Sequence, residues 1–235
     1  MKKIISFSLY GADDKYTIGM LCNVELAKII YPEWICRIYY GDSVPKHMIE
    51  RLSNYDNVEL VHMEENNTVS YMTWRFLAID DNDVEIMLSR DADSRLSFRE
   101  KKLVDLFIES EYHLHDIRDH GCHTDLMGGT WGMKKNSKIN MKELLGSNQI
   151  YDVYRHEYGH DQFFMRDHVV PKFIDDRLIH TSNFNPENGH YSKDFPVSFD
   201  DVLSPLIGTE HRNRHFVGEV FPTDNYNKSF NYVFY

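Results

Sequence analysis

The sequence predicts an α/β fold with a mostly parallel central sheet, and three observations point to it. Short apolar runs rich in branched and aromatic residues recur along the chain, as in Ile4–Leu9 and Trp34–Tyr40. Segments with apolar residues at helical spacing separate these runs. Proline and glycine mark where many of the segments begin or end. Strands that alternate with helices at short spacing are typical of a domain whose sheet is mostly parallel.

Each predicted strand is a short run of apolar, branched or aromatic residues. Tyr10 and Gly11 end the first run, and Gly41 ends the second. The fourth run, Val84–Leu88, leads directly into a cluster of charged residues. In chain order, the strands are expected at residues 4–9, 34–40, 58–63, 84–88, 112–117 and 178–181.

Each predicted helix repeats apolar residues at helical spacing or carries a start or stop signal. Pro32 ends the first helix, and Pro45 begins the second. Ser97 caps the fourth, with Glu100 three residues on, which forms a capping box. In chain order, the helices are expected at residues 17–30, 45–52, 68–79, 97–108, 140–146 and 161–173. The glycine-rich run at 128–132 is interpreted as a turn.

The length of 235 residues fits a single domain. We expect a core over about residues 1–181. Asn, Pro, Gly and Asp are frequent from residue 182 onward and periodicity is poor, so we expect residues 182–235 to wrap the core and line a site. The sequence leaves the oligomeric state open.

The net charge of −11 argues against a nucleic-acid binder, since such proteins need an excess of Lys and Arg. No apolar run approaches the roughly 18 residues of a membrane helix, so no transmembrane segment is expected. The cysteines Cys22, Cys36 and Cys122 are odd in number and widely spaced, which favours reduced thiols. With no signal-peptide pattern after Met1, the expected location is the cytoplasm.

Asp91 and Asp93 are the strongest candidates for chemistry because they follow the strand 84–88. An open α/β sheet binds ligands at the carboxyl ends of its strands. Mg²⁺ and Mn²⁺ prefer oxygen ligands, commonly one or two carboxylates plus substrate phosphates. A solvated turn with Arg90 and Arg95 as ion-pair partners remains the alternative. Asp81 and Asp83 have the same spacing but precede the strand, so they are interpreted as a turn.

Histidines provide two further candidates. His180 ends the late strand and is expected at the same sheet edge as Asp91, either as a metal ligand or as an ordinary core histidine. His156-Glu157-Tyr158-Gly159-His160 matches the zinc-peptidase pattern H-E-x-x-H. Gly159 would lie inside the required helix, and Arg155 and Asp161 flank it, so a chance match is the preferred interpretation.

Three other residues have both a functional and a structural interpretation. Asp161 begins a helix, where it is either a first-turn anion or a carboxylate at a sugar site. Gly129 either lets the backbone approach a ligand closely or only forms a turn. Arg75 either binds a phosphate or nucleotide or pairs with a carboxylate.

An ordered set of motifs resembles small GT-A-type glycosyltransferases found in bacteria and large DNA viruses. The resemblance covers roughly residues 4–220. Its motifs are Trp74-Arg75-Phe76, Ser89-Arg90-Asp91-Ala92-Asp93-Ser94-Arg95, Arg99-Glu100, Arg118-Asp119-His120, Gly128-Gly129-Thr130-Trp131-Gly132, Tyr158-Gly159-x-Asp161-Gln162 and Phe216-Val217-Gly218-Glu219.

The resemblance implies a Rossmann-like, nucleotide-sugar-binding GT-A fold with a DxD motif. In such enzymes Asp91 and Asp93 would hold Mn²⁺ or Mg²⁺ against the diphosphate of the donor, and Asp91 would also meet the ribose or sugar. His180 best matches a late histidine that completes the metal site in related families, although Thr181 stands where the relatives usually have Asp. The end of the first strand would contact the base and ribose; the residues there are Ser6, Ser8, Tyr10 and Gly11.

The leading hypothesis is therefore a metal-dependent glycosyltransferase that uses a nucleotide sugar, with a UDP-sugar favoured, and a glycan or protein-linked acceptor. Asp161 or Asp119 would orient the sugar or act as the base on the acceptor hydroxyl. Arg75, Arg212 and Arg214 would help stabilise the diphosphate. Two alternatives remain open: a zinc peptidase built on His156, Glu157 and His160, and a carbohydrate-binding protein without catalysis. A phosphohydrolase with Asp91 as nucleophile is weaker, because Arg95 replaces the usual Thr.

Overall fold

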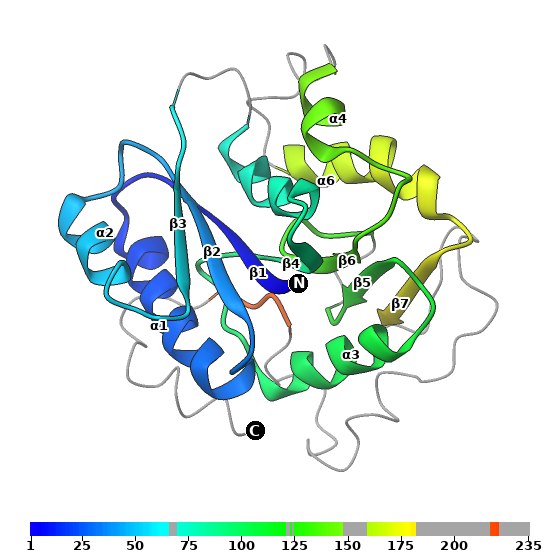
Figure 1. The fold of residues 1–235 in the computed structure, drawn as a ribbon, viewed down its shortest axis with the longest axis horizontal. Helices are drawn as coiled ribbons and strands as arrows, with labels where there is room; N and C mark the ends of the chain where they lie inside the picture. Colours follow the sequence, from blue (N-terminus) through cyan, green and yellow to red (C-terminus); the bar gives the residue numbers. More distant parts are fainter. Residues whose placement is uncertain (66–69, 121–122, 124, 148–158, 182–216, 221–235) are drawn as a thin grey trace.

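The computed structural model describes residues 1–65, 70–120, 123, 125–147, 159–181 and 217–220. Their strands form a seven-stranded sheet in the order β3-β2-β1-β4-β6-β5-β7 (Figure 1). The strands are β1 (Lys2–Leu9), β2 (Ile35–Tyr40), β3 (Val58–His62), β4 (Val84–Arg90), β5 (Leu114–Arg118), β6 (Thr130–Lys134) and β7 (Arg177–Thr181). That residues 182–235 wrap the core stays a prediction, since only 217–220 of them are described.

The sheet is mostly parallel, as predicted. Only β6 runs antiparallel to its neighbours among the described strands, and it lies between β4 and β5. The prediction of a turn over residues 128–132 was wrong for Thr130–Gly132, which lie in β6. Gly132 allows this strand to sit tightly beside β4, because a Cβ there would lie 2.6 Å from the Leu88 side chain. The antiparallel direction places the start of β6 beside the end of β4, with Thr130 opposite Arg90.

Helices cover both faces of the sheet, with α3 below the strands and α4 and α6 above them in Figure 1. The α-helices are α1 (Asp14–Ile30), α2 (Lys46–Leu52), α3 (Phe98–Glu109), α4 (Met141–Ser147) and α6 (His160–Phe164). The segment η1 (Tyr71–Asp80) is a 3₁₀-helix, although the sequence predicted an ordinary helix there. No helix among the described residues is long and apolar enough to cross a membrane.

Two corrections concern helix boundaries. α1 begins three residues before the expected position because the Asp13 side chain caps it, accepting a hydrogen bond from the Lys15 backbone N–H. The helix predicted over 161–173 is three consecutive pieces: α6, a π-helical turn at Met165–Val169 and a 3₁₀ turn at Val170–Phe173. Pro171 lacks a backbone N–H, which explains why regular helix does not continue through the last piece.

Strand β1 shows how the two faces differ. Its side chains alternate between the faces, as in any strand. Ile5, Phe7 and Leu9 belong to the core on the α1 and α3 side. Ile4 belongs to the second core with residues of η1, α4 and the segment after α6. Ser6 and Ser8 share the face of Ile4, so they point toward η1.

Candidate active site

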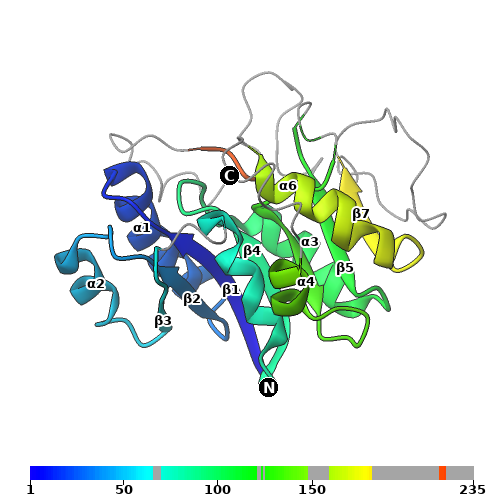
Figure 2. The same ribbon diagram turned by 90° about the horizontal axis from the view of Figure 1, so that it is seen from above.

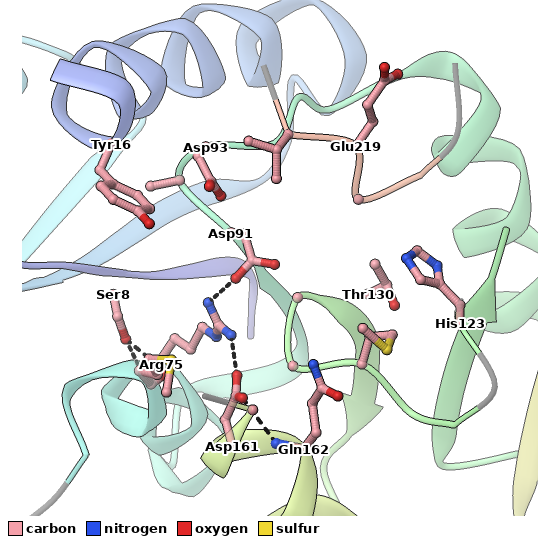
Figure 3. A pocket seen from close by; sticks show the side chains of 18 of the residues that line it. Ser8, Tyr16, Arg75, Asp91, Asp93, His123, Thr130, Asp161, Gln162 and Glu219 are labelled. Carbon is pink, nitrogen blue, oxygen red and sulfur yellow. Dashed lines mark hydrogen bonds and ion pairs between the residues drawn. The ribbon is translucent and has the colours of Figure 1, made fainter. Parts of the chain in front are cut away.

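A pocket of about 600 Å³ lies where β1 and β4 end (Figure 3). Seven of the predicted site residues line it. They are Ser8, Tyr10, Arg75, Asp91, Asp93, Gly129 and Asp161. The structure therefore brings together side chains from four separate regions of the sequence at the sheet edge where ligands were expected.

Arg75 connects two of the predicted acidic residues. Its Nη1 lies 2.5 Å from Asp91 Oδ1, and its Nη2 lies 2.7 Å from Asp161 Oδ2. The arginine is buried, and the Asp161 side chain is only 6% exposed. The structure shows the pairing with carboxylates, and the binding of a phosphate or nucleotide by Arg75 stays a prediction. Arg75 fixes Asp91 relative to Asp161 and offsets part of their repulsion.

Ser6 and Ser8 attach η1, and with it Arg75, to the end of β1. The Ser6 hydroxyl donates to the Arg75 carbonyl oxygen at 2.6 Å. Ser8 accepts from the Arg75 backbone N–H at 3.0 Å and donates to the Met72 carbonyl at 3.2 Å. Ser6 is fully buried and does not line the pocket, so its predicted contact with a nucleotide is corrected to support of η1. Ser8 supports η1 and also lines the pocket.

Glycines allow the start of β6 to approach the acids closely. A Cβ on Gly128 would lie 1.8 Å from Asp161 Oδ2, and one on Gly129 would lie 1.9 Å from Asp91 Oδ2. No other residue type leaves these carboxylates in place. Burial raises the pKa of Asp161, with Arg75 opposing the shift and Asp91 adding to it.

The loop after β4 is fixed by α1. The Asn23 side-chain amide donates to the Ala92 and Ser94 carbonyls at 3.3 and 2.9 Å, and its oxygen accepts from the Leu96 N–H at 3.1 Å. Gly19 lies so close to this loop that a Cβ there would be 2.2 Å from the Ala92 carbonyl oxygen. No sequence pattern indicated Asn23, because its role depends on how α1 packs across the loop.

Asp91 and Asp93 fit a hard divalent cation that is shared with a phosphate-bearing ligand. Both carboxylates line the pocket, and oxygen is the donor that Mg²⁺ and Mn²⁺ prefer. Within the described ranges, no group of three or more His, Cys, Asp or Glu side chains is placed to hold a metal ion. Two protein carboxylates completed by phosphate oxygens are a common arrangement for Mg²⁺.

His180 is not brought to this pair. It lies on β7, which is separated from β4 by β6 and β5. Three strand spacings of about 4.8 Å put it roughly 14 Å along the sheet from the end of β4. Its Nδ1 lies 2.8 Å from His115 Nε2, and it is buried. The prediction of a metal ligand is thus corrected to a histidine pair, because strand order could not be read from the sequence.

Asp119 is also outside the pocket lining. Its two carboxylate oxygens accept from Nε and Nη2 of Arg99 at 2.6 and 2.5 Å. One of them also accepts from the Val217 backbone N–H at 3.0 Å. Asp119 is therefore corrected from a candidate base to an anchor for residues 217–220, which lie on the opposite side of the molecule from the N-terminus in Figure 2. Gly11 does not line the pocket either, although it adopts a positive φ of 76° just after Tyr10.

The peptidase motif is interrupted. Gly159 has a φ of +83° and precedes α6, which starts at His160. A left-handed residue cannot lie inside a continuous helix, and the zinc motif needs both histidines on one helix. His156 and Glu157, like Arg212 and Arg214, lie outside the described residues.

Several lining residues were not among the predicted site residues, for example Tyr16, His123, Thr130 and Glu219. Burial lowers the pKa of His123 to about 4. Glu219 belongs to a motif of the resemblance, which was the one available signal for it. Thr130 also belongs to a motif of the resemblance, but its position depends on strand β6, which was not predicted.

No protein-family model matches the chain, and no curated protein matches it. Solved structures do resemble it. S. aureus TarS 1–349 superposes with a TM-score of 0.52 at 15% identity, over 78% of this chain and 59% of that one. TarS 1–349 in complex with UDP-GlcNAc gives 0.51 at 14%, over 83% and 63%. The galactosyltransferase LgtC in complex with donor and acceptor sugar analogs gives 0.51 at 11%, over 98% and 96%.

The fold is thus the GT-A type that the sequence predicted. This chain spans about three fifths of TarS 1–349. At sequence identities this low, the comparison shows a shared fold and nothing further about this chain.

Proposed function

We propose that this protein is a glycosyltransferase that moves a sugar from a nucleotide-sugar donor to an acceptor hydroxyl. The observation that carries the proposal is the pocket at the carboxyl ends of β1 and β4, where Arg75 joins Asp91 and Asp161 and where Asp93 lies close by. Open α/β sheets bind ligands at this edge. The GT-A fold supports the same function by analogy.

The charges of the pocket favour a divalent cation. Among the described residues that line it, four have carboxylates, Asp91, Asp93, Asp161 and Glu219, and one has a guanidinium, Arg75; the Lys15 ammonium lies beside Asp93. A diphosphate would be repelled by this lining unless a cation came with it. Mn²⁺ or Mg²⁺ held by Asp91 and Asp93 would offset the charge of a departing nucleoside diphosphate.

The chain's own residues have separable roles in this proposal. Arg75 keeps Asp91 and Asp161 at fixed positions, which limits the reorganisation needed when substrate binds. Asp161 orients the transferred sugar or accepts the proton of the acceptor hydroxyl, and burial supports the second role by raising its pKa. Gly128 and Gly129 let the backbone lie directly against the two acids, so both carboxylates keep their positions in the pocket.

A UDP-sugar is the proposed donor, because the structure of TarS 1–349 with UDP-GlcNAc shares the fold. A glycan or protein-linked glycan is the proposed acceptor. We also propose a cytoplasmic location. Cys22 and Cys36 are buried and form no disulfide among the described residues, which is consistent with a reducing compartment.

Thermal unfolding tests the proposal directly. Wild type and Asp93→Ala would be heated with UDP, GDP, CMP or ADP, each with and without Mn²⁺, and Asp83→Ala would serve as a matched control. We expect UDP with Mn²⁺ to stabilise wild type and Asp83→Ala by about 2.7 kcal/mol at 100 times the dissociation constant, and to leave Asp93→Ala unchanged.

Turnover completes the test. Release of UDP from UDP-sugars should require Mn²⁺ or Mg²⁺ and should rise when an acceptor glycan is added. If no nucleotide stabilises the wild type with either cation, the proposal fails. Glycan binding that ignores both nucleotide and cation would instead support a carbohydrate-binding protein.

A further inference from the structure

We propose that the Lys15 ammonium is a built-in competitor of the divalent cation at Asp93, so that Lys15 lowers the protein's affinity for metal alone. This inference rests on the proposed function, since it concerns the same pocket. Lys15 Nζ lies 3.0 Å from Asp93 Oδ2. Lys15 lies in the first turn of α1, next to the pocket residue Tyr16.

The two acids of the pair are already matched with protein cations in different ways. Asp91 contacts the guanidinium of Arg75, which is buried and also bound to Asp161. Asp93 contacts an ammonium whose side chain is 32% exposed. Arg75 is fixed by two acids, whereas the Lys15 ammonium contacts Asp93 and the Tyr16 ring on a flexible, partly exposed side chain. Lys15 is therefore the cation that can leave.

The backbone on both sides of this contact is held by hydrogen bonds and close packing. The Asp13 side chain caps α1 through the Lys15 N–H at 2.8 Å. Farther along α1, Gly19 and Asn23 hold the loop that carries Asp93. Because α1 and the loop are joined, a cation that binds Asp93 must displace the ammonium rather than the helix.

The displaced Lys15 ammonium can contact the nucleotide. A divalent ion and an ammonium repel each other at short range, so Lys15 leaves as the cation arrives. A nucleoside diphosphate bound to that cation offers the ammonium new anionic oxygens. Metal alone then binds weakly, and metal with nucleotide binds more tightly, because only the second case gives Lys15 a new partner.

The test measures Mn²⁺ binding without nucleotide, by the loss of the electron paramagnetic resonance signal of free Mn²⁺. Lys15→Met is compared with wild type and with Lys28→Met, which removes the same charge from the same helix at a site paired with Asp56. We expect Lys15→Met to bind Mn²⁺ about tenfold more tightly, equal to about 1.4 kcal/mol. Lys28→Met and Lys15→Arg should match wild type, and Asp93→Asn should bind most weakly.

Adding UDP provides the second readout. The gain in Mn²⁺ affinity caused by UDP should be smaller in Lys15→Met than in wild type. Unchanged or weaker Mn²⁺ binding by Lys15→Met overturns the competitor role. That result leaves the glycosyltransferase proposal standing if UDP with Mn²⁺ still stabilises the wild type, so the two failures are distinguishable.

Discussion

Strand β4 has an Asp-x-Asp pair at each end, and the two pairs have different surroundings. Asp81 and Asp83, before the strand, have side chains 52% and 54% exposed. Asp91 and Asp93, after it, are 39% and 10% exposed and line the pocket. Each end also has a buried arginine that contacts two acids. Identical spacing therefore carries no functional information until the direction of the strand is known.

The arginines make the contrast sharper. Arg37 contacts Glu59 at 2.8 Å and also Asp81, whose side chains are 30% and 52% exposed. Arg75 contacts Asp91 and Asp161, and Asp161 is nearly inaccessible. Water can replace Arg37 as a partner of its acids, but it cannot reach Asp161 in the same way. The same residue type thus stabilises a surface at one end and a site at the other.

The largest expected effect is on activity. Asp93→Asn should lower sugar transfer roughly a thousandfold, about 4 kcal/mol, because the charge that offsets the diphosphate would no longer be held. Asp83→Asn, its counterpart at the other end of β4, should retain transfer within about twofold. Initial rates with UDP-sugar and Mn²⁺ measure both. Equal losses in the two variants would mean that the ends of β4 are not functionally distinct.

The next effect is on stability. Arg75→Met should lower the free energy of unfolding by about 3 kcal/mol, because it leaves Asp161 buried without its cation. Arg37→Met should cost about 1 kcal/mol, since its acids remain solvated. Urea unfolding at pH 7 gives both values. The double variant Arg75→Met with Asp161→Asn should recover part of the loss, and no recovery would contradict the role given to Asp161.

The third effect is expected at β5 and β7, at the edge of the sheet away from the two Asp-x-Asp pairs of β4. Burial lowers the pKa of His180 to about 4 and that of His115 well below its usual value. Between pH 6.5 and 4, these two histidines bind protons in the unfolded chain but stay neutral in the folded protein. The free energy of unfolding should therefore fall as the pH falls.

We expect His180→Gln to remove about 2 kcal/mol of this pH-dependent loss. The exposed His47→Gln should leave the loss unchanged. Urea unfolding at pH 7, 6 and 5 gives the slopes. Parallel slopes for wild type and His180→Gln would show that the histidine pair is not the source.

The smallest effect tests the backbone at the carboxyl end of β4. Gly129→Ala places a Cβ 1.9 Å from Asp91 Oδ2, so Asp91 must move, and we expect roughly tenfold weaker binding of UDP with Mn²⁺. Gly146→Ala is the control, because nothing lies within 4 Å of its Cβ and its place in α4 favours alanine. Calorimetric titration measures both affinities. Equal affinities would show that Asp91 tolerates the extra atom.

The parts of this site that depend on strand ends were predictable. Asp91 and Asp93 follow a clear apolar run, and parallel strands end at one edge. The wrong predictions share another cause: the sequence does not show which strands lie next to one another in the sheet. His180 also ends a strand, but β7 lies three strands from β4, and nothing local encodes that order. β6 was missed because glycine predicts a turn, whereas here Gly132 is required by the neighbouring Leu88.

Asp119 and Ser6 failed for a related reason. Asp119 was placed in the site by its motif and Ser6 by its position near the end of the first strand, and each supports a neighbour of the site instead. Ser6 holds η1, and Asp119 holds the backbone at Val217. The sequence identifies polar residues near a site, but only packing decides which of them face the ligand.

The pocket also has a consequence for synthesis of the chain. Its walls include Ser8 near the beginning and Val220 near the end of the sequence. At roughly 5–20 residues per second, a ribosome needs about 6–25 s to proceed from Asp93 to Gly218. The nascent protein therefore exposes its acidic pair well before the last wall exists. The pocket proposed to bind cation and nucleotide together is complete only after residue 220 has left the ribosome.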